Sequence, residues 1–506
     1  MRFPFFTALL ACFPFFVQAH EIPVWWQPVS EYKGLPTERM YETVQAACNI
    51  ITEKSLTPVS ADEFAFAAIK SLSTIDQKVT ASKDGKRVLI LIDGKIMKSF
   101  SAPAENDCSN WSRLALAAAV EVRPYSKKVR EADADEISTI FINAALGTID
   151  SYSHYIMTDP VELEPLKKPA GLGISYRRIG RYLEITDIIP GGAASQTDLA
   201  IGDRISAIHG KIIPELSRVQ VLNLLRGEAG TDAFLTLRRN GKEQNKTITR
   251  TPAVASPVTH YFDEKSKVMA IKISAFTEKT VSGLMTTLRD AFSKKAAGLI
   301  IDLRGNTGGL LKEAVLAADL FLPEGFLMIK TDGRHSDTKH QYISTEKKYR
   351  PVYPIVILID KQTASSAEFF AGVLQEYRHA VVIGTPSYGK SVIQDNESLP
   401  GGGELYLSWA KYYLPSGFSP QGYGIYPNLC TSGKKMQDID KMPAPISYIK
   451  PWTHGDEKEK KKGLALCPPE SRATAPLDIE VARSLLLNRE LYERSLTYFS
   501  LDSAVK

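Results

Sequence analysis

Residues 297–305 read AGLIIDLRG, an apolar run that ends in a glycine. Similar runs occur nearby: VMAIKISAF at 268–276, PIVILID at 354–360 and HAVVIG at 379–384. The segments between these runs carry apolar residues at helical spacing, near 280–293, in LLKEAVLAADLF at 310–321 and in AEFFAGVLQEY at 367–377. Because strands that alternate with helices form right-handed βαβ crossovers, this stretch predicts the α/β fold class with a mainly parallel sheet.

Residues 166–252 have a different pattern, with short β-type runs separated by glycines. The runs are GLGISYRR at 171–178, YLEITDII at 182–189, DRISAIHG at 203–210 and AFLTLRRNG at 233–241, with one helical stretch at 217–227. This pattern is typical of a small β-rich module.

Both ends of the chain have mostly helical patterns, for example ISTIFINAAL at 137–146 and IEVARSLLLNRELYERSL at 479–496. We therefore expect a multidomain chain. Its parts are a helical N-terminal region at 20–165, the β-rich module at 166–252, the α/β core at 253–430 and a C-terminal region at 431–506.

The composition is that of a packed, water-soluble protein. Of 506 residues, 44% are hydrophobic, and 62 basic against 57 acidic side chains leave a net charge of +5. The charges are interspersed, so no concentrated positive field attracts a nucleic-acid backbone. We therefore expect no nucleic-acid partner.

Residues 1–19 form a separate N-terminal element. Arg2 precedes the apolar run FPFFTALLACFPFFV, and small residues precede His20, a pattern typical of an export signal. The residues around Cys12 also fit a lipoprotein signal, which leaves a lipid anchor at Cys12 as the alternative, although more apolar residues follow it. No later run reaches the ~20 apolar residues that span a bilayer, so we expect no transmembrane segment in the mature chain. Because of the export signal, we expect the mature chain in the bacterial periplasm.

Removal of the signal leaves Cys48, Cys108, Cys430 and Cys467. An even number of cysteines in an exported chain, with no CxxC spacing, favours disulfides over zinc, and we predict no metal site. Order along the chain suggests Cys48 with Cys108 and Cys430 with Cys467, although all three pairings stay open.

Unusual residues follow the expected strands at their carboxyl ends, where an open parallel sheet has its reactive crevice. Gly308 and Gly309 follow one strand, and adjacent glycines let N–H groups approach an oxyanion, although a tight turn explains them equally. Ser365 and Ser366 follow another, at the start of a helix. The positive end of a helix favours developing negative charge, although a serine there is ordinarily an N-cap.

The third strand end leads to GTPSYGKS at 384–391, which matches the phosphate-binding pattern GxxxxGK[ST]. A phosphate loop must enter a helix, but the following residues 392–403 hold a proline and three glycines, so we expect no nucleotide and no other cofactor. Lys390 needs another explanation. A desolvated lysine is neutral more readily, and a neutral lysine can act as a general base.

Together these residues resemble the C-terminal processing peptidases, also called tail-specific proteases, a serine peptidase family with a Ser-Lys dyad. TASSAE at 363–368 is similar to the family's TASASE, and DLRGNTGG at 302–309 is similar to its DLRxNPGG. The similarity covers nearly the whole mature chain and includes YLPSG at 413–417, GIYP at 424–427 and IDSYSHY at 149–155. It implies a peptidase core of the crotonase/ClpP-like type.

The resemblance also implies roles for individual residues. Ser365 would be the nucleophile, and Lys390, in a YGK turn 25 positions later, would be its base. Gln394 would orient the lysine amine, and the amides of Gly308 and Ser366 would form the oxyanion hole.

The β-rich module resembles a PDZ domain. Gly171, Leu172, Gly173 and Ile174 stand where the carboxylate-binding loop belongs, and GDRI at 202–205 is similar to the usual GDxI. A PDZ groove adds a peptide as an extra strand and holds its terminal carboxylate on loop amides. A module that serves only interdomain packing is the alternative.

The resemblance implies an exported serine endopeptidase that recognises the C-terminal tails of substrate proteins, with an activating or adaptor protein as a further candidate partner. The alternative is an inactive PDZ adaptor or inhibitor on the same fold. The chain departs from the family's pattern at three places: at Thr307, in the order of Ser366 and Ala367, and at Asn428. The reversed order leaves Ser365 and Ser366 as rival nucleophiles, and the spacing to Lys390 favours Ser365.

Overall fold

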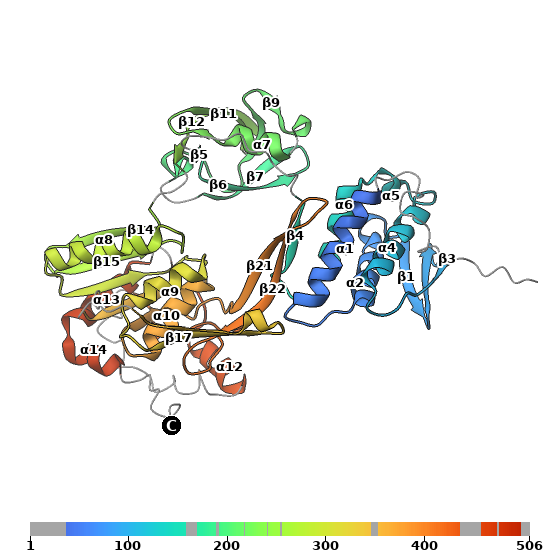
Figure 1. Ribbon diagram of the computed structural model, residues 1–506. Helices are drawn as coiled ribbons and strands as arrows, with labels where there is room; N and C mark the ends of the chain where they lie inside the picture. The colour runs from blue at the N-terminus through green and yellow to red at the C-terminus, as the bar shows by residue number, and fades with distance from the viewer. Residues whose placement is uncertain are drawn as a thin grey trace, which may run out of the picture. The chain divides into compact units, whose positions relative to one another are not determined.

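The computed structural model describes residues 37–157, 169–188, 192–216, 218–239, 241–252, 256–345, 353–435, 457–472 and 475–496. The export signal expected at 1–19, with Cys12, lies outside the described residues. The chain divides into two compact units. The first comprises described residues up to Glu53, Pro58–Met157 and Ser398–Leu405, and the second comprises the others (Figure 1).

Helices with buried apolar faces dominate the first unit. They are α1 (Thr37–Lys54), α2 (Ala61–Lys70), α4 (Cys108–Val122) and α6 (Ala134–Leu146), with the short α3 (Leu72–Ile75) and α5 (Lys127–Glu131). Helix α2 packs against α4 and α6. Its Phe64 and Ile69 are therefore buried, as the helical spacing predicts.

The first unit also contains an antiparallel sheet that the expectation of a helical region omits. Its strands are β1 (Val79–Asp84), β2 (Arg87–Ile92) and β3 (Lys95–Ser101). Asp93 and Gly94 connect β2 to β3, with φ values of 49° and 76°. Positive φ at both positions of a two-residue turn suits a β-hairpin, so the Asp-Gly pair was the local signal for these strands.

The β-rich module is built on a sheet in the order β12-β11-β8-β7-β6, with β9 beside β8. The strands are β6 (Ile174–Ile179), β7 (Tyr182–Ile188), β8 (Arg204–Ile208), β9 (Lys211–Ile212), β11 (Asp232–Arg239) and β12 (Lys242–Thr249). Helix α7 (Arg218–Leu225) contributes Val221 and Leu225 to the core beneath this sheet. A smaller sheet places β5 (Pro169–Gly171) between β10 (Gly227–Glu228) and β13 (Thr251–Pro252).

The central sheet of the second unit has the order β14-β15-β16-β19-β20-β23. Its strands are β14 (Val258–Asp263), β15 (Val268–Ile273), β16 (Gly298–Asp302), β19 (Ile355–Ile359), β20 (Val381–Gly384) and β23 (Leu429–Cys430). Strand β14 is antiparallel to β15, and the remaining neighbours are parallel. The sheet is therefore mainly parallel, as the alternation of strands and helices predicts.

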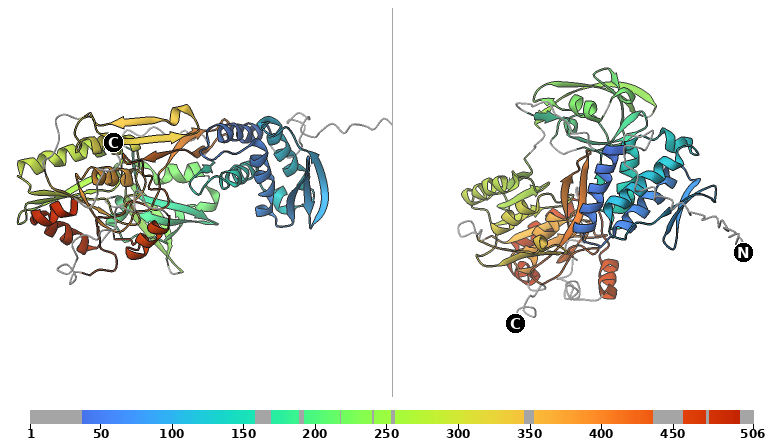
Figure 2. Two further views of the ribbon diagram at one scale, coloured as in Figure 1. Left: turned by 90° about the horizontal axis from the view of Figure 1, so that it is seen from below. Right: turned by 45° about the vertical axis from the view of Figure 1, so that its right-hand side comes forward.

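Helices cover both faces of this sheet. One face, with Ile301 and Ile357, packs on α8 (Thr280–Ser293), α9 (Leu311–Asp319) and α10 (Ser366–Glu376). The other, with Ile300 and Val356, packs on α13 (Pro476–Leu487) and α14 (Arg489–Leu496). In the left view of Figure 2, the red C-terminal helices and α8 lie on opposite sides of the strands. The C-terminal region therefore completes the core.

A second sheet in the order β18-β17-β22-β21 lies beside these layers. Its strands are β17 (Leu327–Gly333), β18 (His340–Ile343), β21 (Val392–Ser398) and β22 (Glu404–Tyr413), and the short β4 (His154–Ile156) and helix α12 (Glu457–Leu466) complete the main elements. Among the described residues, no helix combines the length and apolar character needed to cross a bilayer.

The described residues contain two disulfides, Cys48–Cys108 and Cys430–Cys467, with Cα separations of 5.7 and 6.0 Å. This is the pairing that order along the chain favours. The first links α1 to α4, and the second links β23 to the segment that follows α12.

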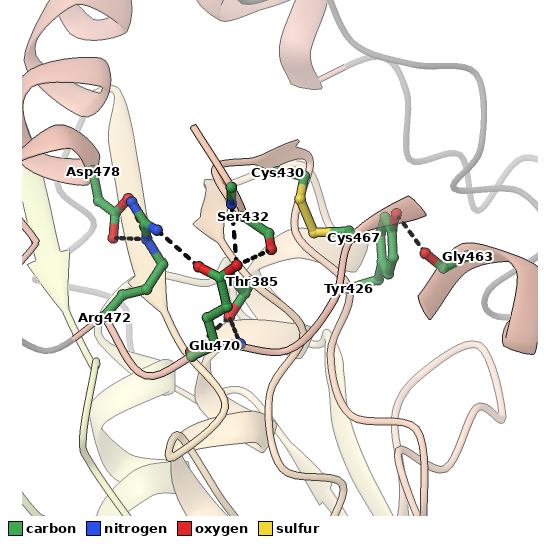
Figure 3. Close-up of a disulfide and its surroundings, with 10 residues drawn as sticks. Thr385, Tyr426, Cys430, Ser432, Gly463, Cys467, Glu470, Arg472 and Asp478 are labelled. Atoms are coloured by element: carbon green, nitrogen blue, oxygen red, sulfur yellow. Dashed lines mark hydrogen bonds and ion pairs between the residues drawn. A yellow bond between two sulfur atoms is a disulfide. The ribbon is translucent and has the colours of Figure 1, made fainter. Parts of the chain in front are cut away.

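The segment after Cys467 is fixed to the central sheet by polar contacts (Figure 3). The Glu470 carbonyl accepts a hydrogen bond from Thr385 Oγ1 at 3.0 Å, directly after β20. Arg472 Nε and Arg304 Nη1 donate to the buried Asp478 carboxylate at 3.0 and 3.1 Å. These contacts hold the C-terminal chain against the loops that follow β16 and β20.

Candidate active site

Three loops meet at the carboxyl edge of the central sheet, after the adjacent strands β16, β19 and β20. Hydrogen bonds of 2.9 Å join them: Gly305 N–H to Asp360 Oδ1, Ala364 N–H to the Asn306 carbonyl and Tyr388 N–H to the Thr363 carbonyl. The structure thus brings together the strand ends at which the sequence placed its chemistry. The reason is that neighbouring parallel strands end at the same edge.

Ser365 occupies the sharp turn between β19 and α10. Its φ of 56° and ψ of −122° lie in a region that residues with a side chain rarely adopt. A Cβ built on Gly308 would lie 2.9 Å from the Ser365 Cβ, so a larger residue at position 308 would collide with it. The turn therefore holds the half-buried Ser365 side chain beside the glycine-rich loop and at the positive end of α10.

Ser366 is held differently from its neighbour. It is 2% exposed, and its Oγ donates to the Gly309 carbonyl at 2.9 Å. The Ser366 hydroxyl therefore anchors α10 to the glycine-rich loop. Its backbone nitrogen lies 3.1 Å from the point that a Gly308 Cβ would occupy, so the two predicted oxyanion residues are neighbours.

The Gly308 N–H has a partner in the structure. It donates to Asn306 Oδ1 at 2.8 Å, while Asn306 Nδ2 donates to the Ile273 carbonyl at 2.9 Å. The buried Asn306 side chain thus fixes the peptide between Thr307 and Gly308 in the observed orientation.

Lys390 and Gln394 lie together after β20. Lys390 Nζ donates to Gln394 Oε1 at 2.7 Å, the contact that the expected orienting role requires. Strand β21 begins at Val392, so a strand follows the GxxxxGKS match, and the helix that a phosphate loop needs is not at this position.

A buried glutamate, Glu368, connects the serine turn to the lysine loop. Its Oε2 accepts the backbone N–H groups of Ser365 and Lys390, each at 2.8 Å, and its Oε1 accepts from Gly389 N–H at 2.7 Å and Ser387 Oγ at 2.5 Å. Burial raises the pKa of Glu368 to about 7, while these hydrogen bonds act in the opposite direction. The sequence motif TASSAE contains Glu368 but does not by itself indicate these contacts, although a serine followed three positions later by glutamate is the signature of a helix-capping box.

Glu376, at the other end of α10, has a similar environment away from the three loops. It is 2% exposed, and it accepts hydrogen bonds from Ser416 N–H at 2.9 Å and Ser416 Oγ at 2.6 Å. Burial raises the pKa of Glu376 to about 7 from 4.5, against the effect of the Ser416 hydrogen bonds.

We expect Glu376→Gln to make the stability less dependent on pH. A carboxyl whose pKa is higher in the folded state stabilises fully below pH 4.5, and this contribution is lost as the pH rises through about 7. The difference in Tm, variant minus wild type, should therefore be larger at pH 8 than at pH 5.5, by about 2 °C or more. The same change at the exposed Glu278 is the control. Equal Tm differences at both pH values would contradict the expectation.

In the β-rich module, the predicted carboxylate loop connects β5 to β6. Leu172 is buried, and its carbonyl accepts a hydrogen bond from Ala194 N–H at 2.7 Å. Gly173 has a φ of 70°, and a Cβ there would lie 2.9 Å from the Gly192 Cα, so the position requires glycine. Ile174 begins β6, the last strand in the order of its sheet.

Comparison with known proteins defines the family. Residues 267–430 match the model of peptidase family S41. A carboxy-terminal-processing protease of Bartonella bacilliformis is 30% identical over 343 residues, 66% of this chain and 78% of that protein. The chain belongs to peptidase family S41. It is a serine-type peptidase of the carboxy-terminal-processing group.

Two further comparisons have lower sequence identity. A probable CtpA-like serine protease of Staphylococcus aureus strain COL is 26% identical over 375 residues, 73% of this chain and 74% of that protein. The solved structure of the photosystem II D1 C-terminal processing protease matches with 18% identity and a TM-score of 0.45, over 78% of this chain and 93% of that chain.

One departure from the S41 pattern has a structural explanation. Asn428 Oδ1 accepts hydrogen bonds from Gln375 Nε2 and Val382 N–H, both at 2.8 Å. Its Nδ2 donates to the Ser495 carbonyl at 3.2 Å, which a carboxylate cannot do. The amide thus ties β20 and α10 to the end of α14.

Within the part of the chain that the structure describes, no group of three or more histidine, cysteine, aspartate or glutamate side chains could hold a metal ion.

Proposed function

We propose that this S41 peptidase is an exported endopeptidase that binds C-terminal tails of substrate proteins through a PDZ domain at 166–252 and cleaves with a dyad of Ser365 and Lys390. One observation carries the proposal: Glu368 Oε2 accepts the backbone N–H of both residues at 2.8 Å. Their two nitrogens are therefore separated by no more than twice that distance. This separation supports a nucleophile and a base that serve the same peptide bond.

The surroundings of the two serines favour Ser365 as the nucleophile. The Ser366 hydroxyl is buried and donates to the Gly309 carbonyl, so it would have to break that bond to react. Ser365 is half-buried, and its strained turn resembles the strand-to-helix elbows that expose nucleophiles in other hydrolases.

In acylation, Ser365 Oγ forms a bond to the scissile carbonyl carbon while the neutral Lys390 amine takes the hydroxyl proton. Gln394 Oε1, which accepts the hydrogen bond from Nζ, keeps the amine in place. The carbon–nitrogen bond then breaks, and Lys390 returns the proton to the leaving amine. In deacylation, the same amine removes a proton from water, and the hydroxide attacks the ester carbonyl carbon. The bond between that carbon and Ser365 Oγ then breaks, and the Lys390 ammonium returns its proton to Oγ.

The amides of Gly308 and Ser366 would stabilise the oxyanion, each by roughly 3 to 4 kcal/mol. Ser366 is the first residue of α10, where backbone N–H groups have no partner within the helix. The Gly308 N–H donates to Asn306, so this role requires the peptide between Thr307 and Gly308 to rotate when substrate binds.

One feature supports the recognition of protein tails, and another supports the export of this chain. Strand β6 ends its sheet, so its outer edge can pair with a peptide, and Gly171 to Ile174 precede or begin that strand with backbone amides for a carboxylate. The two disulfides are typical of proteins that fold in an oxidising compartment, in agreement with a signal at residues 1–19.

Cleavage of an unstructured peptide with a free or an amidated C-terminus tests this proposal. We expect the wild-type protein to cut both, with kcat/KM about tenfold or more lower for the amide, because charge-assisted hydrogen bonds to the carboxylate are lost. An inactive adaptor would leave both peptides intact, as the Ser365→Ala protein should. Equal kcat/KM values for the two peptides would contradict tail recognition and leave the dyad standing.

A further inference from the structure

The Glu368 carboxylate makes contacts beyond those that cap α10. A capping box accounts for its contact with the Ser365 N–H, three residues earlier. The three other donors, Ser387 Oγ, Gly389 N–H and Lys390 N–H, belong to the loop after β20. One carboxylate therefore joins the turn that carries the proposed nucleophile to the loop that carries the proposed base.

Both segments have little freedom around this carboxylate. The Ser365 carbonyl accepts from the Tyr412 hydroxyl at 3.1 Å, so both sides of the serine turn are held. Ser387 Oγ accepts from Ile425 N–H at 2.6 Å, and a Cβ on Gly389 would lie 2.8 Å from the Tyr423 nitrogen. The lysine loop is thus held between Glu368 and residues 423–425.

The chemistry of the site requires a carboxylate at position 368. Each oxygen accepts two hydrogen bonds, and all four partners donate to it. A glutamine accepts with its carbonyl oxygen only, and its NH₂ group would face two of the donors. Glutamine therefore preserves the volume of the side chain but loses the two hydrogen bonds whose donors would face its NH₂ group.

We infer that Glu368 is a positioning residue that sets the distance and orientation between Ser365 and Lys390. This inference rests on the proposed dyad. The donors to its carboxylate are the backbone N–H groups of Ser365, Gly389 and Lys390 and the Ser387 hydroxyl, so Glu368 would act through the placement of the two backbones. Its loss should lower kcat, since a displacement of about 1 Å between reacting groups can reduce a rate about 100-fold.

Helix α10 supplies a matched control for this inference. Glu376 is buried on the same helix, and a serine hydroxyl donates to its carboxylate as Ser387 does to that of Glu368. Its contacts lie outside the three loops. Glu376→Gln therefore repeats the change of charge and the loss of a buried carboxylate without changing the proposed dyad.

The experiment compares the purified full-length variants on one short peptide substrate, with kcat, KM and Tm measured for each. We expect Glu368→Gln to lower kcat about 100-fold with KM within threefold of wild type. Glu376→Gln should keep kcat within threefold, although its Tm changes by a similar amount. Equal kcat values for these two variants would overturn the inference.

A milder pair covers the case in which Glu368→Gln does not fold. Ser387→Ala removes one hydrogen bond to Glu368, and Ser416→Ala removes the equivalent bond to Glu376. The first should lower kcat about tenfold, as expected for the loss of a hydrogen bond to a charged group, and the second less than threefold. Equal effects on kcat would overturn the inference.

The dyad variants distinguish this inference from the proposal beneath it. Loss of turnover in Ser365→Ala and Lys390→Ala, with a normal Glu368→Gln, would refute only the positioning role. Normal turnover in both dyad variants would refute the proposed function itself, and the positioning role with it.

Discussion

Ser365→Ala is expected to lower the rate of peptide cleavage by about 10⁴-fold or more, because the hydroxyl that forms the covalent intermediate is lost. The change removes one oxygen atom from a half-buried position, so the fold should persist. Mass spectrometry of the peptide products over time measures the rate, and the unfolding temperature confirms that the variant is folded.

Ser366→Ala is the matched control for this prediction. It removes the hydrogen bond from Oγ to the Gly309 carbonyl, which stabilises by about 1 kcal/mol in a typical case. Cleavage should therefore fall by about tenfold at most. The opposite result, an active Ser365→Ala and an inactive Ser366→Ala, would assign the nucleophile to Ser366.

The second large effect is expected at Lys390. Lys390→Ala should lower kcat about 10³-fold or more, because no group then accepts the Ser365 proton. Lys390→Arg should be equally inactive at every pH from 6 to 10, since a guanidinium keeps its proton in this range. The arginine variant thus separates a base from a cation that merely stabilises charge.

The pH dependence of kcat for wild type and Lys390→Arg provides the measurement. Substantial activity in Lys390→Arg, above about a tenth of wild type, would mean that position 390 contributes a positive charge and that another group accepts the proton. Both variants keep the backbone N–H of residue 390 that donates to Glu368, and the side chain they change is half-buried, so we expect both to fold. Measurement of Tm verifies this.

Local patterns in the sequence predicted the central sheet and the position of its reactive edge. The four apolar runs became β15, β16, β19 and β20, and three of them end at the loops that carry Gly308, Ser365 and Lys390. This works because burial on both faces of a parallel sheet produces continuous apolar runs, and because parallel strands end at one edge.

Two features of the fold go beyond what the residue patterns predict. Residues 79–101 form a sheet beside alanine-rich helices, and the strong helical periodicity of those neighbours predicts helix for the whole region. Helices α13 and α14 lie where the helical pattern at 479–496 predicts helices, but that pattern did not indicate that Leu477 and Leu485 cover one face of the central sheet. Periodicity identifies an apolar face, but it does not identify the surface on which that face packs.

The linear order of residues was enough to predict the motifs and the spacing of Ser365 and Lys390, and it favoured the disulfide pairing that the structure has. The burial of Ser366, the partner of the Gly308 amide and the four donors on Glu368 became visible only in the folded chain. The physical reason is that Glu368 meets its own helix through a local contact, whereas it meets residues 387–390 because β19 and β20 are neighbours in the sheet. Contacts of that second kind depend on the pairing of strands, which no local pattern of residues encodes.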